Sequence, residues 1–410
     1  MTRFILWVFI IFLIEFKNVQ AGLLDKLDVP KIEPKSIVKK ATETTSDFDI
    51  DLDDIDIPNI TKKELLTFIN FKSTFNKTYA TIEEEKVAIK NLISMKREVD
   101  LHNKRYEDGE ETFMRGLNIL SDLTPEDVNK LVNGFVKPKR EKSFIKSEDY
   151  DDGEEENYEN FYDEDEDENE EEGTILDILK RRKRSNKVED KNESLNYTAK
   201  GFIHPVIAQG KCGSCWSFAS ISAIEAQWFK KTGKLEKLSE QQLIDCDRDD
   251  EGDGNYGCAG GSMDVAFKFI KKFGKIAPCS DYPYEGNDTY KCKKLDGIVT
   301  VLSHENLTPG DENLLKKKLF EIGPIPIAVD ASLSSFQTYK SGVYFDKQCT
   351  TNSNHAMLIV GFGYDEKTEL KYWLIKNTYG KSWGLQGYMK LARDVDNHCG
   401  VAEYASYPIV

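Results

Sequence analysis

Hydrophobic residues recur at helical spacing in the first third of the chain. Between Thr61 and about Asn103 they stand on a background rich in Glu and Lys. Apolar positions three or four residues apart are typical of an amphipathic helix. We therefore predict a small helical unit here, with an apolar face formed by Leu65, Phe68, Phe71, Val87, Leu92, Met95 and Val99.

The second half of the chain changes from helical to strand-like patterns. The stretch "WSFASISAIEAQW", Trp216 to Trp228, has the spacing of a long helix. His355 opens the apolar run "AMLIVGFG", and Asn377 ends the run "KYWLIKN". Both runs are typical of buried strands. Two adjacent strands would place that His and that Asn side by side.

The N-terminus has the layout of a secretory signal peptide over residues 1–21. Arg3 precedes an apolar run from Phe4 to Ile14, and small residues stand at Val19 and Ala21. The run is too short for a comfortable membrane span, although a short anchor is the alternative. Six Asn-x-Ser/Thr sequons accord with a secreted glycoprotein; they start at Asn59, Asn76, Asn192, Asn196, Asn287 and Asn306.

Charge is spread unevenly along the 410 residues. The formal net charge is −16, but residues 185–410 carry 27 Lys+Arg against 29 Asp+Glu. Most of the acidity lies in one run, Glu148 to Glu172, with 17 acidic residues out of 25. Such a run cannot bury enough apolar surface to offset its self-repulsion, so we predict a disordered acidic linker over 147–173. No basic surface for nucleic acid is indicated.

A basic segment, residues 180–184, follows the acidic run as "KRRKR". A solvated patch or a localisation signal is the simplest interpretation. In a secreted chain, however, an exposed multibasic segment between two regions invites endoproteolysis. Arg181 to Arg184 resembles a proprotein-convertase site.

The cysteines offer three kinds of chemistry. All eight lie after residue 211, as in a disulfide-bonded domain of an oxidising compartment. The pair in "KCGSCW", Cys212 and Cys215, fits a redox dithiol, half of a zinc site, or a structural thiol beside a nucleophile. Zinc would need a second closely spaced ligand pair, and the chain has no other Cys-x-x-Cys.

A nucleophilic thiol needs a base that is held by a third group. His355 and Asn377 provide both far downstream, at the ends of the two predicted strands. Cys215 stands at the start of a predicted helix, where the helix dipole favours a thiolate. Taken singly, each residue also suits a structural role; taken together, they suit nucleophilic catalysis.

The segment "QGKCGSCW" resembles the active-site segment of papain-like cysteine proteases, closest to the cathepsin L branch. Further segments follow in that family's order: "LSEQQLIDCD", "GCAGG", "YPYEG", "SGVYF", "NHAMLIVGFG", "YWLIKNTYGKSWG", "GYMKLARD" and "NHCGVAEYASYPIV". The N-terminal half resembles the family's inhibitory propeptide. It keeps Glu84 and Asn103 in the pro-helix, and Gly116, Asn118 and Asp122 in the second motif, where Leu120 replaces the usual aromatic.

The resemblance implies an α+β, papain-like two-domain fold. A helical domain and a β-barrel-like domain would flank an active-site cleft, preceded by a small α-helical propeptide domain. It implies a propeptide over 22–184, with the helical inhibitor domain at about 62–125, and a mature peptidase domain over 185–410. It also implies three disulfides, Cys212 with Cys258, Cys246 with Cys292, and Cys349 with Cys399, leaving Cys279 over.

The resemblance also assigns roles at the site. Cys215 would be the nucleophile, His355 its partner in a thiolate and imidazolium pair, and Asn377 the group that orients the imidazole. The Gln209 side-chain amide and the Cys215 backbone N–H would form the oxyanion hole. Substrate contacts are implied for Gly260, Gly261, Met263, Ala328, Asn354, Ala356, Trp383 and Tyr404.

Two positions depart from the family pattern. Tyr379 stands where a Trp usually shields the His and Asn hydrogen bond, and Ala259 replaces a usual Asn.

The resemblance also bears on specificity. Tyr404 would form the floor of the pocket for the second residue before the scissile bond. We expect that pocket to be apolar and shallow, preferring Val, Leu or Pro to Phe, Tyr or Arg.

The sequence thus predicts a cysteine endopeptidase made as a zymogen in the secretory pathway, extracellular or lysosomal. It would need no metal or cofactor. Its partners would be protein or peptide substrates, its own propeptide and cystatin-like inhibitors, with no nucleic acid and no membrane after signal removal; the mature form would be a monomer. The alternatives are a catalytically silent papain-fold binding protein and a thiol-disulfide oxidoreductase with a Cys212–Cys215 disulfide.

Overall fold

The structure, a computed structural model, describes residues 60–138, 193–248 and 255–410. The predicted signal peptide, the predicted acidic linker and the predicted basic processing segment lie outside these residues. The chain divides into two compact units, residues 1–70 and 71–410. The first unit contributes only residues 60–70 to the described part, so the second contains almost all of the fold.

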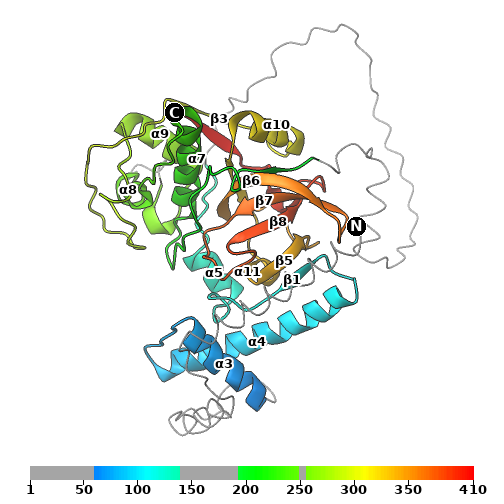
Figure 1. Cartoon of the computed structure of the whole chain (residues 1–410). Helices are drawn as coiled ribbons and strands as arrows, with labels where there is room; N and C mark the ends of the chain where they lie inside the picture. Colours follow the sequence, from blue (N-terminus) through cyan, green and yellow to red (C-terminus); the bar gives the residue numbers. More distant parts are fainter. Residues whose placement is uncertain (1–59, 139–192, 249–254) are drawn as a thin grey trace, which may run out of the picture. The chain divides into compact units, whose positions relative to one another are not determined.

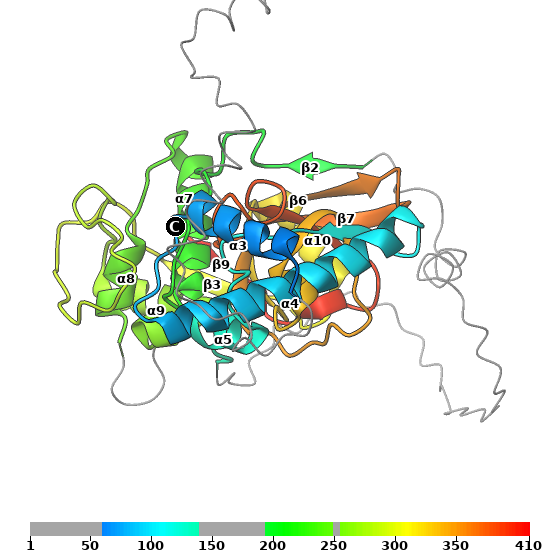
Figure 2. The same ribbon diagram turned by 90° about the horizontal axis from the view of Figure 1, so that it is seen from below.

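The predicted helical unit consists of two helices, α3 (Lys62–Thr74) and α4 (Ile82–Glu107). Figure 2 shows α4 as one long uninterrupted helix. Its start is fixed by Thr81, whose side chain accepts a hydrogen bond from the Glu84 N–H. Acidic residues in its first turn and basic residues in its last turn complement the helix dipole. The strand β1 (Phe113–Arg115) and the helix α5 (Pro125–Leu131) follow.

A helical half forms around α7 (Cys215–Thr232), the helix predicted from Trp216 to Trp228. Its first twelve residues are all buried, and Gly233 ends it in the left-handed conformation at φ 73°. Figure 1 shows the other helices of this half beside α7. They are α8 (Glu240–Cys246), the 3-10 turn η3 (Gly257–Ala259) and α9 (Met263–Phe273).

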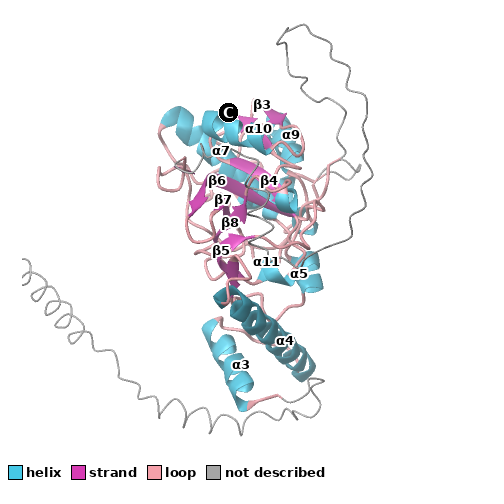
Figure 3. Ribbon diagram, turned by 90° about the vertical axis from the view of Figure 1, so that its right-hand side faces the viewer, coloured by secondary structure: helices cyan, strands magenta, loops and turns pink. Residues whose placement is uncertain are grey.

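A mixed sheet forms the other half, and α7 lies beside it (Figure 3). The strand order is β1-β5-β8-β7-β6-β2, and β4 pairs with β6 as well. The strands are β2 (Leu195–Asn196), β4 (Ile325–Val329), β5 (Tyr339–Tyr344), β6 (His355–Asp365), β7 (Leu370–Lys376) and β8 (Tyr388–Ala392). The remaining elements are β3 (Ser303–Asn306), α10 (Glu312–Ile322), α11 (Ser334–Gln337), η4 (His398–Gly400) and β9 (Ser406–Ile409), where β3 pairs with β9.

Two hydrophobic cores correspond to the two halves. The helical core is built around Trp216, Ile224 and Phe267, and the sheet core around Phe336, Trp373 and Trp383. Residues of the pro-region enter the sheet core as well; they are Phe113, Leu120, Val128 and Val132. The fold is therefore α+β with a helical half and a sheet half, as predicted, and residues 113–132 pack as part of the sheet half.

The pro-region is joined to the sheet by backbone pairing. β1 runs antiparallel to β5, so that Phe113 lies opposite Gly342. The Gly116 N–H donates to the Thr338 carbonyl oxygen at 2.7 Å, and the Asn118 side chain donates to the Gln337 carbonyl oxygen at 2.8 Å. Gly116 and Asn118, two residues of the predicted second pro-motif, are therefore hydrogen-bonded to the segment that precedes β5.

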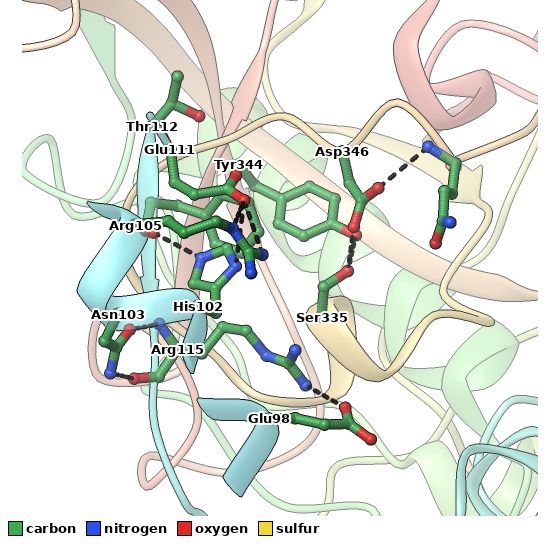
Figure 4. A network of polar contacts seen from close by, with 12 residues as sticks. Glu98, His102, Asn103, Arg105, Glu111, Thr112, Arg115, Ser335, Tyr344 and Asp346 are labelled. Carbon is green, nitrogen blue, oxygen red and sulfur yellow. Dashed lines mark hydrogen bonds and ion pairs between the residues drawn. The ribbon is translucent and has the colours of Figure 1, made fainter. Parts of the chain in front are cut away.

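A polar network surrounds this junction (Figure 4). The Asn103 side chain exchanges two hydrogen bonds with the Arg115 backbone, both at 2.9 Å. The buried Arg115 guanidinium contacts Glu98 at 3.1 Å. Because these bonds tie α4 to β1, Asn103 fixes the position of the strand that pairs with β5.

Three disulfides join Cys212 to Cys258, Cys246 to Cys292 and Cys349 to Cys399. Cys215 is free and buried, and Cys279 is free and half-buried. Since Cys212 is bonded to Cys258, a Cys212–Cys215 disulfide is not formed. None of the helices in the described ranges is both long and apolar enough to cross a bilayer.

Candidate active site

The thiol of Cys215 lies at the junction of the two halves. Cys215 is the first residue of α7 and its side chain is fully buried. The Ala356 N–H, from β6, donates to the Cys215 Sγ at 3.4 Å. A helix therefore supplies the thiol, and a strand of the other half meets it.

His355 and Asn377 meet through the register of β6 and β7. The two strands run antiparallel, with Leu358 opposite Lys376, so the start of β6 lies beside the end of β7. The His355 Nε2 and the Asn377 Oδ1 are 2.8 Å apart. Because the carbonyl oxygen of the amide can only accept, the Nε2 carries the hydrogen and the Nδ1 is left to act as a base. The structure thus pairs His355 with Asn377, and Ala356, the residue after His355, contacts the Cys215 thiol.

Tyr379 covers this pair. Its ring stacks on the His355 imidazole with centroids 4.6 Å apart and planes at 29°, and only 3% of the residue is exposed. Its hydroxyl group donates to the Asn133 side-chain oxygen in the pro-region. The tyrosine that replaces the usual tryptophan therefore still shields the His355 ring.

Trp383 occupies a different environment from the one expected for a substrate contact. It is fully buried in the sheet core, and its indole N–H donates to the Phe336 carbonyl oxygen at 3.0 Å. The aromatic side chain that touches the His355 ring is Tyr379. In the full-length chain, this placement favours the packing role for Trp383.

The Gln209 side chain is held in place and points at a carbonyl group of the pro-region. Its Nε2 donates to the Val132 carbonyl oxygen at 2.8 Å and to the Cys212 carbonyl oxygen at 2.7 Å. The Thr378 hydroxyl donates to its Oε1, which fixes which end of the amide faces the thiol. A carbonyl oxygen from outside the mature domain therefore occupies the place of the expected oxyanion.

The pro-region runs through the site from Val132 to Val136. The Gly134 N–H donates to the Cys215 Sγ at 3.3 Å. The Gly261 N–H donates to the Gly134 carbonyl oxygen at 2.8 Å, and the Val136 N–H donates to the Gly261 carbonyl oxygen at 2.9 Å. This is a parallel bridge around Phe135. The pro-region therefore presents an amide donor to the thiol.

Glycine is required at the closest approach. A Cβ on Gly134 would lie 1.9 Å from the Gly213 carbonyl oxygen, and one on Gly260 would lie 2.8 Å from the Gly134 carbonyl oxygen. Sequence reasoning identified Gly260 and Gly261 but missed Asn133, Gly134 and Phe135. An Asn-Gly pair is an ordinary turn signal, and nothing local marks it as an active-site contact.

Phe135 fills the pocket expected for the second residue before the scissile bond. Its ring lies 5.2 Å from the Tyr404 ring, and only 8% of the residue is exposed. Its N–H donates to the Asn354 carbonyl oxygen at 2.9 Å. Met263, Ala328 and Ala356 belong to the same apolar cluster. The side chains predicted to line this pocket therefore lie in one apolar cluster with a phenylalanine of the same chain.

Burial sets the protonation states of the covered site. It raises the pKa of the Cys215 thiol to about 11, although backbone N–H groups, including those of Ala356 and Gly134, oppose the shift. Burial lowers the pKa of His355 to about 4, against the hydrogen bond that the ring donates to Asn377. Both charged forms are thus disfavoured while the pro-region excludes water.

A buried ionic network lies behind Asn377. The Lys237 Nζ contacts Glu225 at 3.1 Å and also forms an ion pair with Glu240. A small cavity of about 10 Å³ separates this network from Asn377, and the Lys376 side chain lines it too. Burial lowers the pKa of Lys376 to about 8, against the attraction of Glu225.

Comparison with known proteins gives two matches along the chain. Residues 191–409 match the papain family of cysteine proteases, and residues 68–128 match the cathepsin propeptide inhibitor domain. The first match contains Gln209, Cys215, His355 and Asn377, whereas Val132 to Val136 lie between the two matches.

Similar proteins share this arrangement over most of their length. A cathepsin L-like peptidase of Aedes aegypti is 40% identical over 342 residues, which is 83% of this chain and 91% of that protein. Procathepsin L of Rattus norvegicus is 37% identical over 353 residues, with 83% and 90% covered. The solved structure of digestive procathepsin L 3 from the Tenebrio molitor larval midgut has a TM-score of 0.68 at 29% identity, covering 85% of this chain and all of that one.

Proposed function

Because the chain belongs to the papain family of cysteine proteases, we propose that Cys215, His355 and Asn377 carry out its hydrolytic reaction. The chain is a cathepsin L-like cysteine endopeptidase made as a zymogen with its own inhibitory propeptide domain. The observation that carries the proposal is the 2.8 Å contact between the His355 Nε2 and the Asn377 Oδ1, which leaves the Nδ1 as the free base, together with the contact of the neighbouring Ala356 N–H with the thiol.

Catalysis begins when the pro-region leaves and water reaches the site. The His355 Nδ1 then takes the Cys215 proton, giving a thiolate and an imidazolium. The thiolate attacks the peptide carbonyl carbon and forms a tetrahedral intermediate. The imidazolium donates its proton to the leaving amine, which gives a thioester. A water molecule, deprotonated by His355, hydrolyses the thioester and restores the thiol.

The oxyanion of the tetrahedral intermediate would be bound by the Gln209 Nε2 and the Cys215 backbone N–H. The bond from Gln209 to the Val132 carbonyl oxygen supports this assignment, because it places a carbonyl oxygen at 2.8 Å from the donor. One such donor is typically worth about 3 to 4 kcal/mol of transition-state stabilisation. The 2.7 Å bond to Cys212 and the bond from Thr378 hold the amide ready without reorganisation.

We assign the propeptide to residues 22–184 and the mature peptidase to 185–410. The inhibitory part, at about 62–125, extends further, because Val132 to Val136 also contact the site. The basic segment Arg181 to Arg184 would provide the activating cut. Removing Arg181, Lys183 and Arg184 together should slow maturation at neutral pH. An unchanged rate with the same mature N-terminus would point to autocatalysis or to another site.

The pocket around Tyr404 would select the second residue before the scissile bond. Support comes from Phe135, which occupies it against Met263, Ala328 and Ala356. A misfit of one or two methylenes is worth about 1 to 3 kcal/mol, so we expect preferences of roughly 10- to 200-fold in kcat/KM. Fluorogenic dipeptides with Leu or Phe at this position, tested on wild type and Tyr404→Ala, measure it. If the variant changes nothing, Tyr404 is not the pocket floor.

The secretory pathway is the proposed location, extracellular or lysosomal, with the signal peptide at residues 1–21. The four sequon asparagines in the described part of the chain, Asn76, Asn196, Asn287 and Asn306, are all exposed, and three disulfides accord with an oxidising compartment. Protein substrates and its own propeptide are its partners. We further propose that the mature enzyme is a monomer open to cystatin-like inhibitors.

Cys215→Ser tests the proposal. The oxygen is nearly isosteric but a far weaker nucleophile, so hydrolysis should fall by orders of magnitude while the three disulfides and the fold persist. Activity is measured with a fluorogenic peptide, and the thiol is titrated in parallel with an epoxide-type inhibitor. Retained activity in the variant would refute the assignment. A wild-type enzyme that binds the titrant at no site would favour the catalytically silent alternative.

A further inference from the structure

The exposed side of α9 carries a row of lysines. Lys268, Lys271 and Lys272 stand three and four residues apart, and Lys275 continues the row just after the helix ends. Residues at this spacing share one face of a helix. All four are exposed, while Met263, Ala266, Phe267 and Ile270 on the opposite side are buried. We call these four residues the lysine face.

The lysine face has few acidic neighbours. No acidic residue occurs from Val265 to Ser280. Within the described part of the chain, no carboxylate forms an ion pair with the four lysines. Lys294, also exposed, adds to the same area, because its Nζ lies 5.9 Å from the centre of the Phe273 ring at the end of α9. Asp264, buried in the first turn of α9, is the acidic residue one turn before Lys268. The surface therefore carries a local excess of positive charge, while the other residues of 185–410 carry 22 Lys+Arg against 29 Asp+Glu, a net charge of −7.

The pro-region leaves the site beside the start of α9. Val136 is bonded to Gly261 at 2.9 Å, two residues before α9 begins at Met263. A helix of 11 residues is about 16 Å long, so Lys268, Lys271 and Lys272 lie within about that distance of the start of α9. The described pro-region ends at residue 138, ten residues before the acidic run begins at Glu148. Ten residues span up to about 35 Å, which covers the distance.

We propose that the acidic run Glu148 to Glu172 docks on the lysine face and holds the propeptide on the mature domain. The run carries 17 acidic residues in 25 and no basic residue. It precedes the basic segment 180–184, so after a cut at Arg184 it remains with the propeptide. This inference rests on the propeptide boundary that we proposed above. It gives the acidic insert, which is foreign to the family pattern, a role as an electrostatic tether.

The affinity of the tether should depend strongly on salt. Exposed ion pairs are weak singly, each changing an affinity by about twofold, and they are screened by salt. Three lysines together should therefore contribute roughly eightfold at low ionic strength. The backbone and aromatic contacts of Gly134 and Phe135 are apolar or buried, so they supply a part of the affinity that salt changes little.

The test uses the full chain with Cys215→Ser, and a recognition sequence for a site-specific protease replaces residues 181–184. The chain is cut, and the dissociation constant of the propeptide is measured by analytical ultracentrifugation. Salt is set at about 20 mM and about 300 mM NaCl, which shortens the Debye length from roughly 20 to 6 Å. Because the chain is inert and cut by an added enzyme, the result does not depend on the proposed nucleophile or on a convertase.

Three variants decide the outcome. In the first, all 17 acidic residues of the run become Asn or Gln. The second is Lys268→Gln, Lys271→Gln and Lys272→Gln, which removes three charges but keeps a good helix former. The matched control is Lys234→Gln, Lys317→Gln and Lys347→Gln, which removes three exposed lysines elsewhere.

We expect the first two variants to weaken binding at low salt, the lysine variant by about eightfold, and to equal the wild type at high salt. The control should stay within about twofold of the wild type. Unchanged binding in the acidic variant overturns the proposal. A loss in the acidic variant alone means that the run pairs elsewhere, and an equal loss in the control means a general charge effect; both overturn the assigned site. If the lysine variant binds the propeptide as tightly as the wild type does, but the lysine face binds heparin, the face is a site for an external polyanion. The proposal is then also wrong.

Discussion

Phe135→Ala should expose the active-site thiol of the uncut zymogen. Phe135 is the largest apolar group that the pro-region places in the cleft, and it is only 8% exposed against Tyr404. Burying a Phe side chain contributes about 1.5 to 3 kcal/mol, and an aromatic pair adds about 0.5 to 1.5 kcal/mol. Truncation removes most of both, while the Phe135 N–H keeps its bond to Asn354. We therefore expect a loss of about 2 to 3 kcal/mol in the closed state.

This loss raises the fraction of molecules in the open state, in which the pro-region has moved away from Cys215, by about 30- to 150-fold. The assay is alkylation of Cys215 by iodoacetamide in a chain whose residues 181–184 are changed so that it stays uncut. Buried Cys215 has a raised pKa and meets the Gly134 N–H, so it should react only from the open state. Mass spectrometry of the peptides separates Cys215 from Cys279. Since Cys279 is half-buried in the helical half, its rate reports general unfolding.

Val136→Ala is the matched control. Val136 is the next residue and is 39% exposed, so its truncation should change the Cys215 rate less than about fivefold. The reasoning is refuted if Phe135→Ala reacts no faster than this control. It is equally refuted if the Cys279 rate rises as much as the Cys215 rate, because the mutation would then unfold the domain rather than open the cleft. Phe135→Leu tests which side chain the pocket fits. Faster alkylation of Cys215 in this variant than in the wild type would mean that the pocket fits a phenyl ring better than a leucine side chain.

Three further predictions follow from the site. Gln209→Ala should lower kcat/KM of the mature enzyme by about 10²- to 10³-fold, because one oxyanion donor is lost, with little change in stability. Kinetics with a fluorogenic peptide measure kcat/KM, and a thermal melt measures stability. An unchanged kcat/KM would contradict the assignment. Lys237→Met should lower the free energy of unfolding by about 3 to 5 kcal/mol, because it leaves the buried carboxylates of Glu225 and Glu240 without their cation. Urea unfolding measures this loss, and a loss under about 1 kcal/mol would show that water replaces the lysine. Burial lowers the pKa of Lys376 to about 8 from its ordinary 10.5, so the unfolded state binds the proton more tightly and this group's contribution to the free energy of unfolding should rise with pH between these values. Lys376→Met should remove that slope, and equal slopes in the two proteins would show that Lys376 is charged when folded.

Local sequence patterns predicted more of this site than expected from residues so far apart along the chain. The helix that begins at Cys215 and the strands bounded by His355 and Asn377 followed from apolar periodicity and length alone. Once both strands were expected, their adjacency followed from the short connection between β6 and β7. The three disulfide pairings and the role of Gln209 came from resemblance, because spacing by itself leaves many pairings open.

The sequence by itself determined the chemistry available: a thiol at a helix start, a base and an amide at strand ends, and a pro-region with strong helical periodicity. Tertiary structure alone decided which groups meet. It placed Val132 on Gln209 and Phe135 on Tyr404, paired β1 with β5, and buried Trp383 in the sheet core. Those contacts join segments up to about 270 residues apart, and they depend on shape, burial and backbone pairing across the cleft. Periodicity reports only which face of an element is buried, so it carries no information on the partner that buries it.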